Sequence, residues 1–155
     1  MSKCEIETEF PKGIYEDIDF AVLLQIAGRM IAQHVEAIGK ESKLSAGHLS
    51  VLGMVHRRPR MAQNVYGSVL AVNDATLGRY VDKLEEHGLV QRERCDLDRR
   101  TVCLLLTDAG LEYILSVKAR LAEQREEVTG GLPDGDIAQL QASLVSYLAG
   151  AGPDL

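Results

Sequence analysis

The sequence lacks the long apolar runs, targeting segments and cysteine spacings that define several common protein classes. No window approaches the roughly 18 to 20 apolar residues that a membrane helix needs, and the first ten residues lack the apolar core of a signal peptide. We therefore expect a cytoplasmic protein without membrane attachment. The three cysteines, Cys4, Cys95 and Cys103, are odd in number and show neither zinc-site nor disulfide-framework spacing. We interpret them as free thiols in a reducing compartment.

Motifs of the common enzyme classes are also missing. The chain contains no GxGxxG, P-loop, nucleophile elbow, HExxH or convergent pair of carboxylates. Its four histidines lie on different segments without ligand spacing, which favours ordinary surface or core-edge residues over a metal site. We expect a protein that is not an enzyme and that needs no cofactor and no metal.

Length and charge indicate one integrated domain with an uneven surface. The chain has 155 residues, of which 46% are hydrophobic, so it can form a single core. A formal net charge of −6 argues at first against a nucleic-acid partner. However, residues 51–100 hold nine basic and seven acidic residues, whereas the rest of the chain holds eight basic and sixteen acidic residues. A mildly positive middle is therefore flanked by acidic ends.

The first half of the chain predicts an arm followed by three helices. Residues 1–14 show no sustained period, and residues 15–40 carry a long apolar stripe typical of an amphipathic helix. Ser45 is a plausible N-cap for a second helix, which should end at Arg57-Arg58-Pro59. Residues 61–70 predict a short third helix, and Gly67 within it suits a close helix crossing. A helix-turn-helix requires such a crossing.

Residues 73–110 predict a helix that leads directly into a β-hairpin. Asn73 and Asp74 supply a cap and a negative charge at the start of this helix, and Gly88 is a left-handed stop. One face is apolar and the opposite face is exposed. The apolar face holds Leu77, Tyr80, Val81 and Leu84, and the opposite face holds Ala75, Arg79, Asp82 and Glu86. In the second strand, Val102, Leu104 and Leu106 should share one side, and Thr101, Cys103 and Leu105 the other.

The two ends of the chain predict a dimer. A helix of roughly six turns follows Thr107, and a last helix runs from about 134 to 148. Like the first helix, these carry apolar stripes that the middle of the chain does not obviously cover, which favours a contact between two copies. We divide the domain into an arm and dimerisation helix (1–40), a central region (44–110) and C-terminal dimerisation helices (111–150).

An ordered set of short motifs resembles the MarR family of winged helix-turn-helix regulators. The set comprises residues 70–79 (LAVNDATLGR), 84–90 (LEEHGLV), 98–100 (DRR) and 106–110 (LTDAG). The resemblance covers roughly residues 44–112 with its spacing intact. It implies a mainly α fold with a small β-hairpin wing, that is, a winged helix-turn-helix flanked by long N- and C-terminal dimerisation helices. It also implies a homodimer that regulates transcription, commonly as a repressor released by a small molecule or an oxidant.

The resemblance and the residues together predict a surface for double-stranded DNA, in the form of a pseudopalindromic operator. Arg79 can donate to guanine or to phosphate in the major groove, and Lys83 can contact phosphate. Arg99 is assigned to a narrow minor groove, with Asp98 and Arg100 bracing the wing. The predicted DNA-binding residues are Asn73, Asp74, Ala75, Thr76, Arg79, Lys83, Asp98, Arg99 and Arg100.

The resemblance further implies a pocket for a small aromatic or anionic effector where the dimerisation helices meet the DNA-reading region. Its predicted residues are His34, His48, Met54, His56 and Arg79. Gly78 and Cys95 depart from the family pattern, and the acids of the exposed helix face weaken attraction to DNA. Two alternatives stay open. One is a winged helix that binds a protein instead of DNA, and the other is a thiol-based redox sensor, for which Arg94 beside Cys95 is the main argument.

Overall fold

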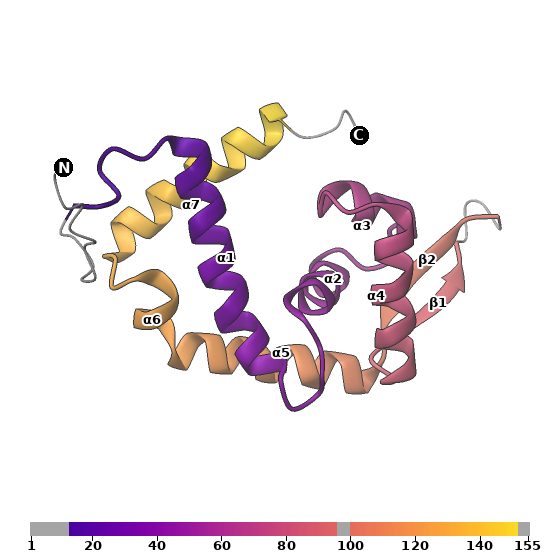
Figure 1. Ribbon diagram of the computed structural model, residues 1–155. Coiled ribbons are helices and arrows are strands. Elements are labelled where there is room, and N and C mark those ends of the chain that lie inside the picture. Colours follow the sequence, from indigo (N-terminus) through magenta and orange to yellow (C-terminus); the bar gives the residue numbers. More distant parts are fainter. Residues whose placement is uncertain (1–12, 96–99, 152–155) are drawn as a thin grey trace, which may run out of the picture.

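The computed structural model describes residues 13–95 and 100–151, which form a mainly helical chain with one two-stranded antiparallel hairpin (Figure 1). The elements follow in the order α1 (Phe20–Gly39), α2 (Ala46–Arg57), α3 (Gln63–Val69), α4 (Asp74–Glu86), β1 (Val90–Arg94), β2 (Val102–Leu106), α5 (Asp108–Glu123), α6 (Arg125–Thr129) and α7 (Asp134–Ala151). α2, α3, α4 and the hairpin form one side of the molecule, whereas α6, α7 and the first half of α1 form the other. α5 runs between the two sides.

The core lies in the half that contains α2, α4 and the hairpin. Val51, Leu52 and Val55 of α2 are fully buried, as are Leu84 of α4 and Leu104 of β2. Ile114 and Val117 of α5 and Ile38 at the end of α1 complete this cluster. The burial of apolar side chains thus fixes α2, α4 and β2 as one unit.

The helix predicted from Asn73 onward is confirmed as α4, including its cap and its two faces. Asn73 Oδ1 accepts a hydrogen bond of 2.8 Å from the backbone N–H of Thr76. Leu77, Val81 and Leu84 are buried, and the four residues predicted for the opposite face are exposed. The preceding α3 crosses closely, as predicted from Gly67, because a Cβ there would lie 3.2 Å from Leu77 Cδ2 of α4 and 3.1 Å from the Val72 carbonyl oxygen in the turn.

A tight junction joins the end of α4, the hairpin and the start of α5. Gly88 adopts a left-handed conformation with φ of 65°, which ends the helix. Thr107 Oγ1 donates to the Gly88 carbonyl at 2.6 Å, and the Thr107 N–H donates to the Leu89 carbonyl at 3.2 Å. Gly110 in the first turn of α5 lies so close to Leu89 that a Cβ would come within 1.9 Å of the Leu89 carbonyl oxygen. Three elements are therefore positioned by one crossing.

Two predicted helix boundaries are wrong. The first helix begins at Phe20 rather than near Tyr15, because residues 13–18 form turns. The helix after Thr107 breaks at Gln124 and continues as the separate α6. The regular pairing of β2 with β1 keeps the two predicted sides of the strand, but burial does not follow them, because Val102 is exposed while the adjacent Cys103 and Leu104 are both buried. Cys103 is covered because it forms an isolated antiparallel bridge with Ala62, which precedes α3.

The interpretation of the cysteines as free thiols is also corrected for one pair. Cys95 and Cys103 form a disulfide across the hairpin, with their Cα atoms 5.4 Å apart. Sequence spacing could not indicate this pair, because the two residues meet only through the register of β1 and β2. Cys4 lies outside the described residues.

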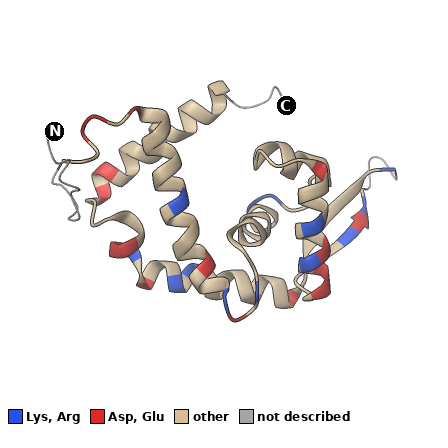
Figure 2. Ribbon diagram, viewed as in Figure 1, with Lys and Arg blue, Asp and Glu red and all other residues tan. Residues whose placement is uncertain are grey.

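The other half of the molecule leaves much apolar surface exposed. Within the described range, neither α6 nor α7 contains a buried residue, and the first half of α1 has none either. The exposed fraction is 62% for both Phe20 of α1 and Leu148 of α7. No charged residue occurs in residues 137–151, and Figure 2 shows α7 and the upper part of α1 almost without charge. None of the described helices is long and apolar enough to cross a membrane.

Two glycine substitutions with opposite effects test this packing. Gly110→Ala should lower the free energy of unfolding by about 1–3 kcal/mol, because the new methyl group must displace the Leu89 backbone. Gly53→Ala, in the middle of α2, should raise it by roughly 0.5–1 kcal/mol, because its Cβ meets no atom within 4 Å and alanine favours helix. Urea unfolding of both variants measures the effects. Equal stability of the two variants would contradict the close crossing.

Candidate nucleic-acid interface

The exposed face of α4 carries most of the residues that the sequence predicts for DNA contact. Ala75 and Arg79 are exposed, and Arg79 Nη2 donates to Thr76 Oγ1 at 3.2 Å. Asn73 and Asp74 lie at the exposed N-terminus of the same helix, and Lys83 lies one turn beyond Arg79. The structure thus brings six of the nine predicted residues onto one helix. An arginine held over the helix surface by a hydroxyl presents a planar fork to a partner.

The wing supplies one further predicted residue within the described range. Arg100 is exposed and lines a groove of about 550 Å³ between α3, α4 and the hairpin. Asp74 and Gln63 line the same groove, so Arg100 and the start of α4 face a common space. Asp98 and Arg99 lie outside the described residues.

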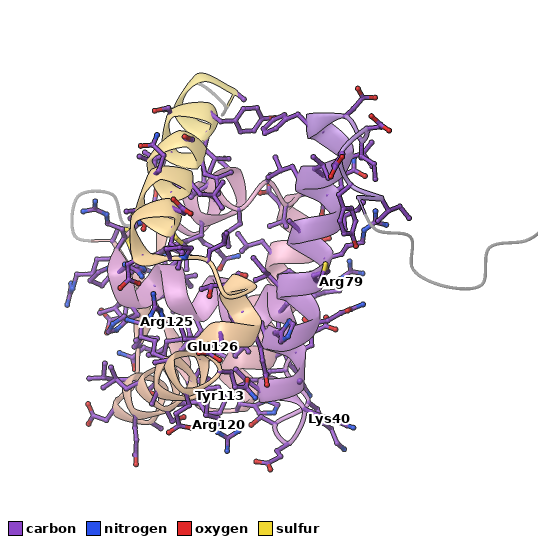
Figure 3. The ribbon with its side chains drawn as sticks, turned by 90° about the vertical axis from the view of Figure 1, so that its left-hand side faces the viewer. Lys40, Arg79, Tyr113, Arg120, Arg125 and Glu126 are labelled. Carbon is purple, nitrogen blue, oxygen red and sulfur yellow. A yellow bond between two sulfur atoms is a disulfide. The ribbon has the colours of Figure 1, made fainter. Side chains whose placement is uncertain are left out.

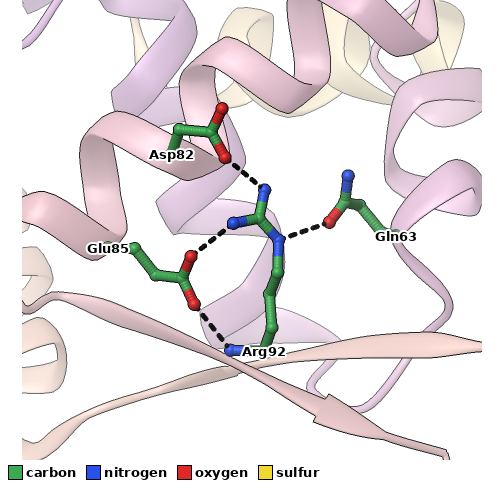
Figure 4. A network of polar contacts seen from close by, with 4 residues as sticks. All are labelled: Gln63, Asp82, Glu85 and Arg92. Carbon is green, nitrogen blue, oxygen red and sulfur yellow. Dashed lines mark hydrogen bonds and ion pairs between the residues drawn. The ribbon is translucent and has the colours of Figure 1, made fainter.

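Arg92 of β1 fastens the wing to α4 and was not singled out by the sequence. Its guanidinium pairs with Glu85 and, at 2.7 Å, with Asp82, both on α4 (Figure 4). Its Nε donates to Gln63 Oε1 of α3 at 3.0 Å, and its backbone N–H donates to Glu85 Oε1 at 3.2 Å. The available signal was the period of β1, because Arg92 shares the inward side of the strand with the buried Val90. An arginine at an inward strand position needs an acidic partner.

Three of the four acids of α4, Asp82, Glu85 and Glu86, are therefore paired within the protein. Asp82 and Glu85 pair with Arg92, and Glu86 pairs with Lys83 at 3.1 Å. Neither Asp82 nor Glu86 pairs with Arg79, whose hydrogen bond goes to Thr76. The weakening of DNA attraction expected from these acids is reduced accordingly, because each has a cation nearby.

The predicted effector residues do not come together. His48 lies at the start of α2, where its Nδ1 accepts from the Ser45 N–H at 3.1 Å and its ring contacts Tyr80 of α4 at 4.8 Å between centroids. Burial lowers the pKa of His48 below its ordinary value, and His87 and Lys83 lower it further. Met54 packs against the core from a later turn of α2, and His56 follows it near the end of that helix.

His34 lies in a different place, in an apolar groove between α1, α6 and α7. This groove has a volume of about 370 Å³ and is lined by Met30, Ile31, Val128 and Leu140, among others. A second groove, of about 350 Å³, lies where the end of α1 meets α5 and is lined by Glu41 and Arg120. Figure 3 shows Arg120 and Tyr113 on α5, below Arg125 and Glu126 of α6. None of the predicted effector residues lines this second groove.

Fold and surface together define a winged helix-turn-helix protein: α3, a tight turn, α4 and a two-stranded wing fixed to α4. The model of the MarR family matches residues 44–102, which include α2, α3, α4 and β1 and end at the first residue of β2. Residues 44–102 thus match the MarR family, in agreement with the resemblance that the sequence motifs predicted.

Solved structures share this fold over most of the chain. CouR from Rhodococcus jostii RHA1, bound to p-coumaroyl-CoA, is 26% identical with a TM-score of 0.75, and the match covers 87% of this chain and 94% of CouR. A cysteine-to-serine variant of MarR from E. coli, complexed with operator DNA, is 21% identical with a TM-score of 0.71, and the match covers 89% and 99% of the two chains. The mainly α fold with a hairpin wing is thereby confirmed.

A curated relative is similar over a shorter stretch. It is a protein from Thauera aromatica described as a transcriptional regulatory protein for the hcr operon, and it is 23% identical over 104 residues. The match covers 67% of this chain and 63% of the relative, which is less than two thirds of the relative's length.

The Arg92 network predicts a difference between two ion pairs of α4. Arg92→Ala should lower the free energy of unfolding by about 1–2 kcal/mol, because it leaves Glu85 and Gln63 without their partner and the Arg92 side chain is only 27% exposed. Lys83→Ala is the matched control and should change it by less than about 0.5 kcal/mol, because the Lys83–Glu86 pair is exposed. Urea unfolding at low and high salt compares the two. A smaller loss for Arg92→Ala than for Lys83→Ala would contradict the anchoring role.

Proposed function

We propose that the protein is a homodimeric transcriptional repressor that binds a pseudopalindromic DNA operator and is released by a small aromatic or anionic effector. The observation that carries this proposal is the exposed face of α4, on which Arg79 is held by Thr76 while the neighbouring acids pair elsewhere. The operator complex of MarR from E. coli and the p-coumaroyl-CoA complex of CouR support DNA and a small molecule as the two kinds of ligand.

In this proposal α4 enters the major groove and the wing enters the adjacent minor groove. Arg79 donates to guanine O6 and N7 or to a phosphate, and the exposed N-terminus of α4 offers backbone N–H groups to phosphate. Arg99 meets the negative potential of a narrow minor groove. Arg100, for which the sequence suggested a bracing role, is exposed and adds a second positive charge to this contact. Because Lys83 is already paired with Glu86, the affinity rests mainly on these arginines and falls steeply with salt.

DNA binding is tested by fluorescence anisotropy on fragments of the intergenic DNA beside the gene, with half-sites about one helical turn, roughly 34 Å, apart. Arg79→Ala and Arg99→Ala should each weaken binding by about 1–3 kcal/mol, that is, roughly 5- to 150-fold. Arg125→Ala removes the same charge from α6, where Arg125 pairs with Asp134, and should leave the Kd within about twofold. The absence of sequence-preferring, salt-sensitive binding would contradict the proposal. Capture of a protein through α4 would then favour the protein-binding alternative.

The homodimer accounts for the uncovered apolar surface of α1 and α7. Phe20 and Tyr147 touch edge to face at 5.8 Å between ring centroids, yet each is largely exposed. Met30, Ile31 and Leu140 line the apolar groove and are about half exposed. A monomer rarely leaves so large an apolar surface in water, and a twofold axis lets the same surface of a second copy cover it.

Light scattering after size exclusion should give twice the chain mass of 17.0 kDa at micromolar concentration. Leu140→Glu should shift the protein toward monomer, because it places a charge in the apolar groove. Val69→Glu introduces the same charge at an exposed apolar residue of α3 and should leave the dimer intact. Circular dichroism verifies that both variants are folded. A monomer of the unmodified chain, or a dimer of Leu140→Glu as stable as the parent, would argue against this interface.

A further inference from the structure

The disulfide closes the hairpin at the point where its regular pairing ends. β1 and β2 pair in register from Val90 opposite Leu106 to Arg94 opposite Val102. Beyond this ladder, the Cys95 N–H donates to the Thr101 carbonyl at 2.9 Å. In this register Cys95 faces Thr101 and Cys103 faces Glu93, so the disulfide joins diagonal rather than opposite residues.

The backbone around the disulfide departs from a regular ladder. Diagonal neighbours in antiparallel strands normally lie about 7–8 Å apart. The Cα atoms of Cys95 and Cys103 are 5.4 Å apart, closer than this diagonal spacing, and the bond joins the two strands covalently at the end of the hairpin. Breaking the bond removes this covalent link and leaves the backbone hydrogen bond from Cys95 to Thr101 at the same end.

The disulfide lies between two arginines with different roles. On one side, Arg92 fixes β1 to Asp82 and Glu85 of α4. On the other side, Arg100 lies within the ring that the disulfide closes, and it lines the groove that also contains Asp74 of α4. The bond thus joins the segment that carries Arg100 to the part of the wing that Arg92 anchors on α4.

The two cysteine residues differ in exposure. Cys103 is 6% exposed and is covered at its backbone by Ala62, whereas Cys95 is half-buried at the edge of the described wing. A reagent in solution therefore reaches Cys95 first. Cys103, held beside it, is placed to act as the second, resolving thiol.

We propose that reversible thiol–disulfide exchange at Cys95 and Cys103 regulates DNA binding, with the oxidised wing as the higher-affinity form. This inference rests on the proposed function of the same surface. A closed ring limits the conformations of Arg100 before DNA arrives, so less entropy is lost on binding. Proteins that work beside DNA meet a reducing pool of thiols, in which such a bond is transient and responds to the redox balance.

A small-molecule disulfide is the oxidant that forms the Cys95–Cys103 bond. The Cys95 thiolate attacks one sulfur of that disulfide, forms a mixed disulfide and releases one small thiolate. Cys103, as its thiolate after losing a proton to water, attacks the Cys95 sulfur and releases the second small thiolate. Two protein thiols are oxidised, one small disulfide is reduced to two thiols, and the reverse reaction restores the open wing.

The test measures operator affinity of the full chain by anisotropy in buffers of reduced and oxidised glutathione. Mass spectrometry after alkylation of the denatured protein counts the thiols in each buffer. We expect the oxidised form to bind about five- to tenfold more tightly, the order expected from ordering one or two side chains in advance. Cys95→Ser should bind like the reduced form in every buffer. Cys4→Ser, the matched control, should keep the full response.

A second variant tests whether the redox effect on operator affinity acts through Arg100. In Arg100→Ala, the ratio of the two affinities should fall toward one, because the residue that the bond positions is gone. Absence of the disulfide in oxidising buffer, equal affinities of both forms, or a full response in Cys95→Ser would each overturn the regulation and leave the proposed function standing. Absence of operator binding in either form would overturn the proposed function and its regulation together.

Discussion

The close crossing of Leu89 and Gly110 is the constraint on which the rest of the winged helix depends. At this point the left-handed Gly88 ends α4, β1 begins, and the first turn of α5 passes within contact of the backbone. Thr107 bonds to both Gly88 and Leu89 while its hydroxyl also caps α5. Because three elements share one crossing, the angle between α4 and the wing is fixed by backbone contacts rather than by long surface side chains.

Arg92 adds a second link between the wing and α4. It uses three side-chain partners from two helices, so rotation of the wing away from α4 would break several charge-assisted hydrogen bonds together. The network also removes Asp82 and Glu85 from the charge that a ligand of α4 would meet. A chain with a net charge of −6 can thus present arginines on a local surface where three of the four acids of α4 are already paired.

Sequence patterns predicted the features that depend on residues close together in the chain. They did not predict the contacts between residues that are far apart in the chain. The faces of α4, its Asn73 cap and the Gly88 stop follow from helical period and capping chemistry, so the sequence sufficed. The role of Arg92 depends on acids seven and ten positions earlier in the chain, on α4, and the Cys95–Cys103 bond depends on strand register. His34 and His48 were grouped by family analogy, but α1 and α2 place them in different surroundings.

Buried side chains are unevenly distributed, so the two halves of the molecule are stabilised in different ways. α2, α4 and β2 bury their own apolar side chains, whereas none of the described residues of α6 or α7 is buried. Those helices gain stability chiefly from whatever covers them, because short helices are marginal in water without packing. A second copy that covered them would also fix the distance between two α4 helices. The same apolar surface would then determine both the stability of the terminal helices and the spacing of the DNA sites that the dimer can recognise.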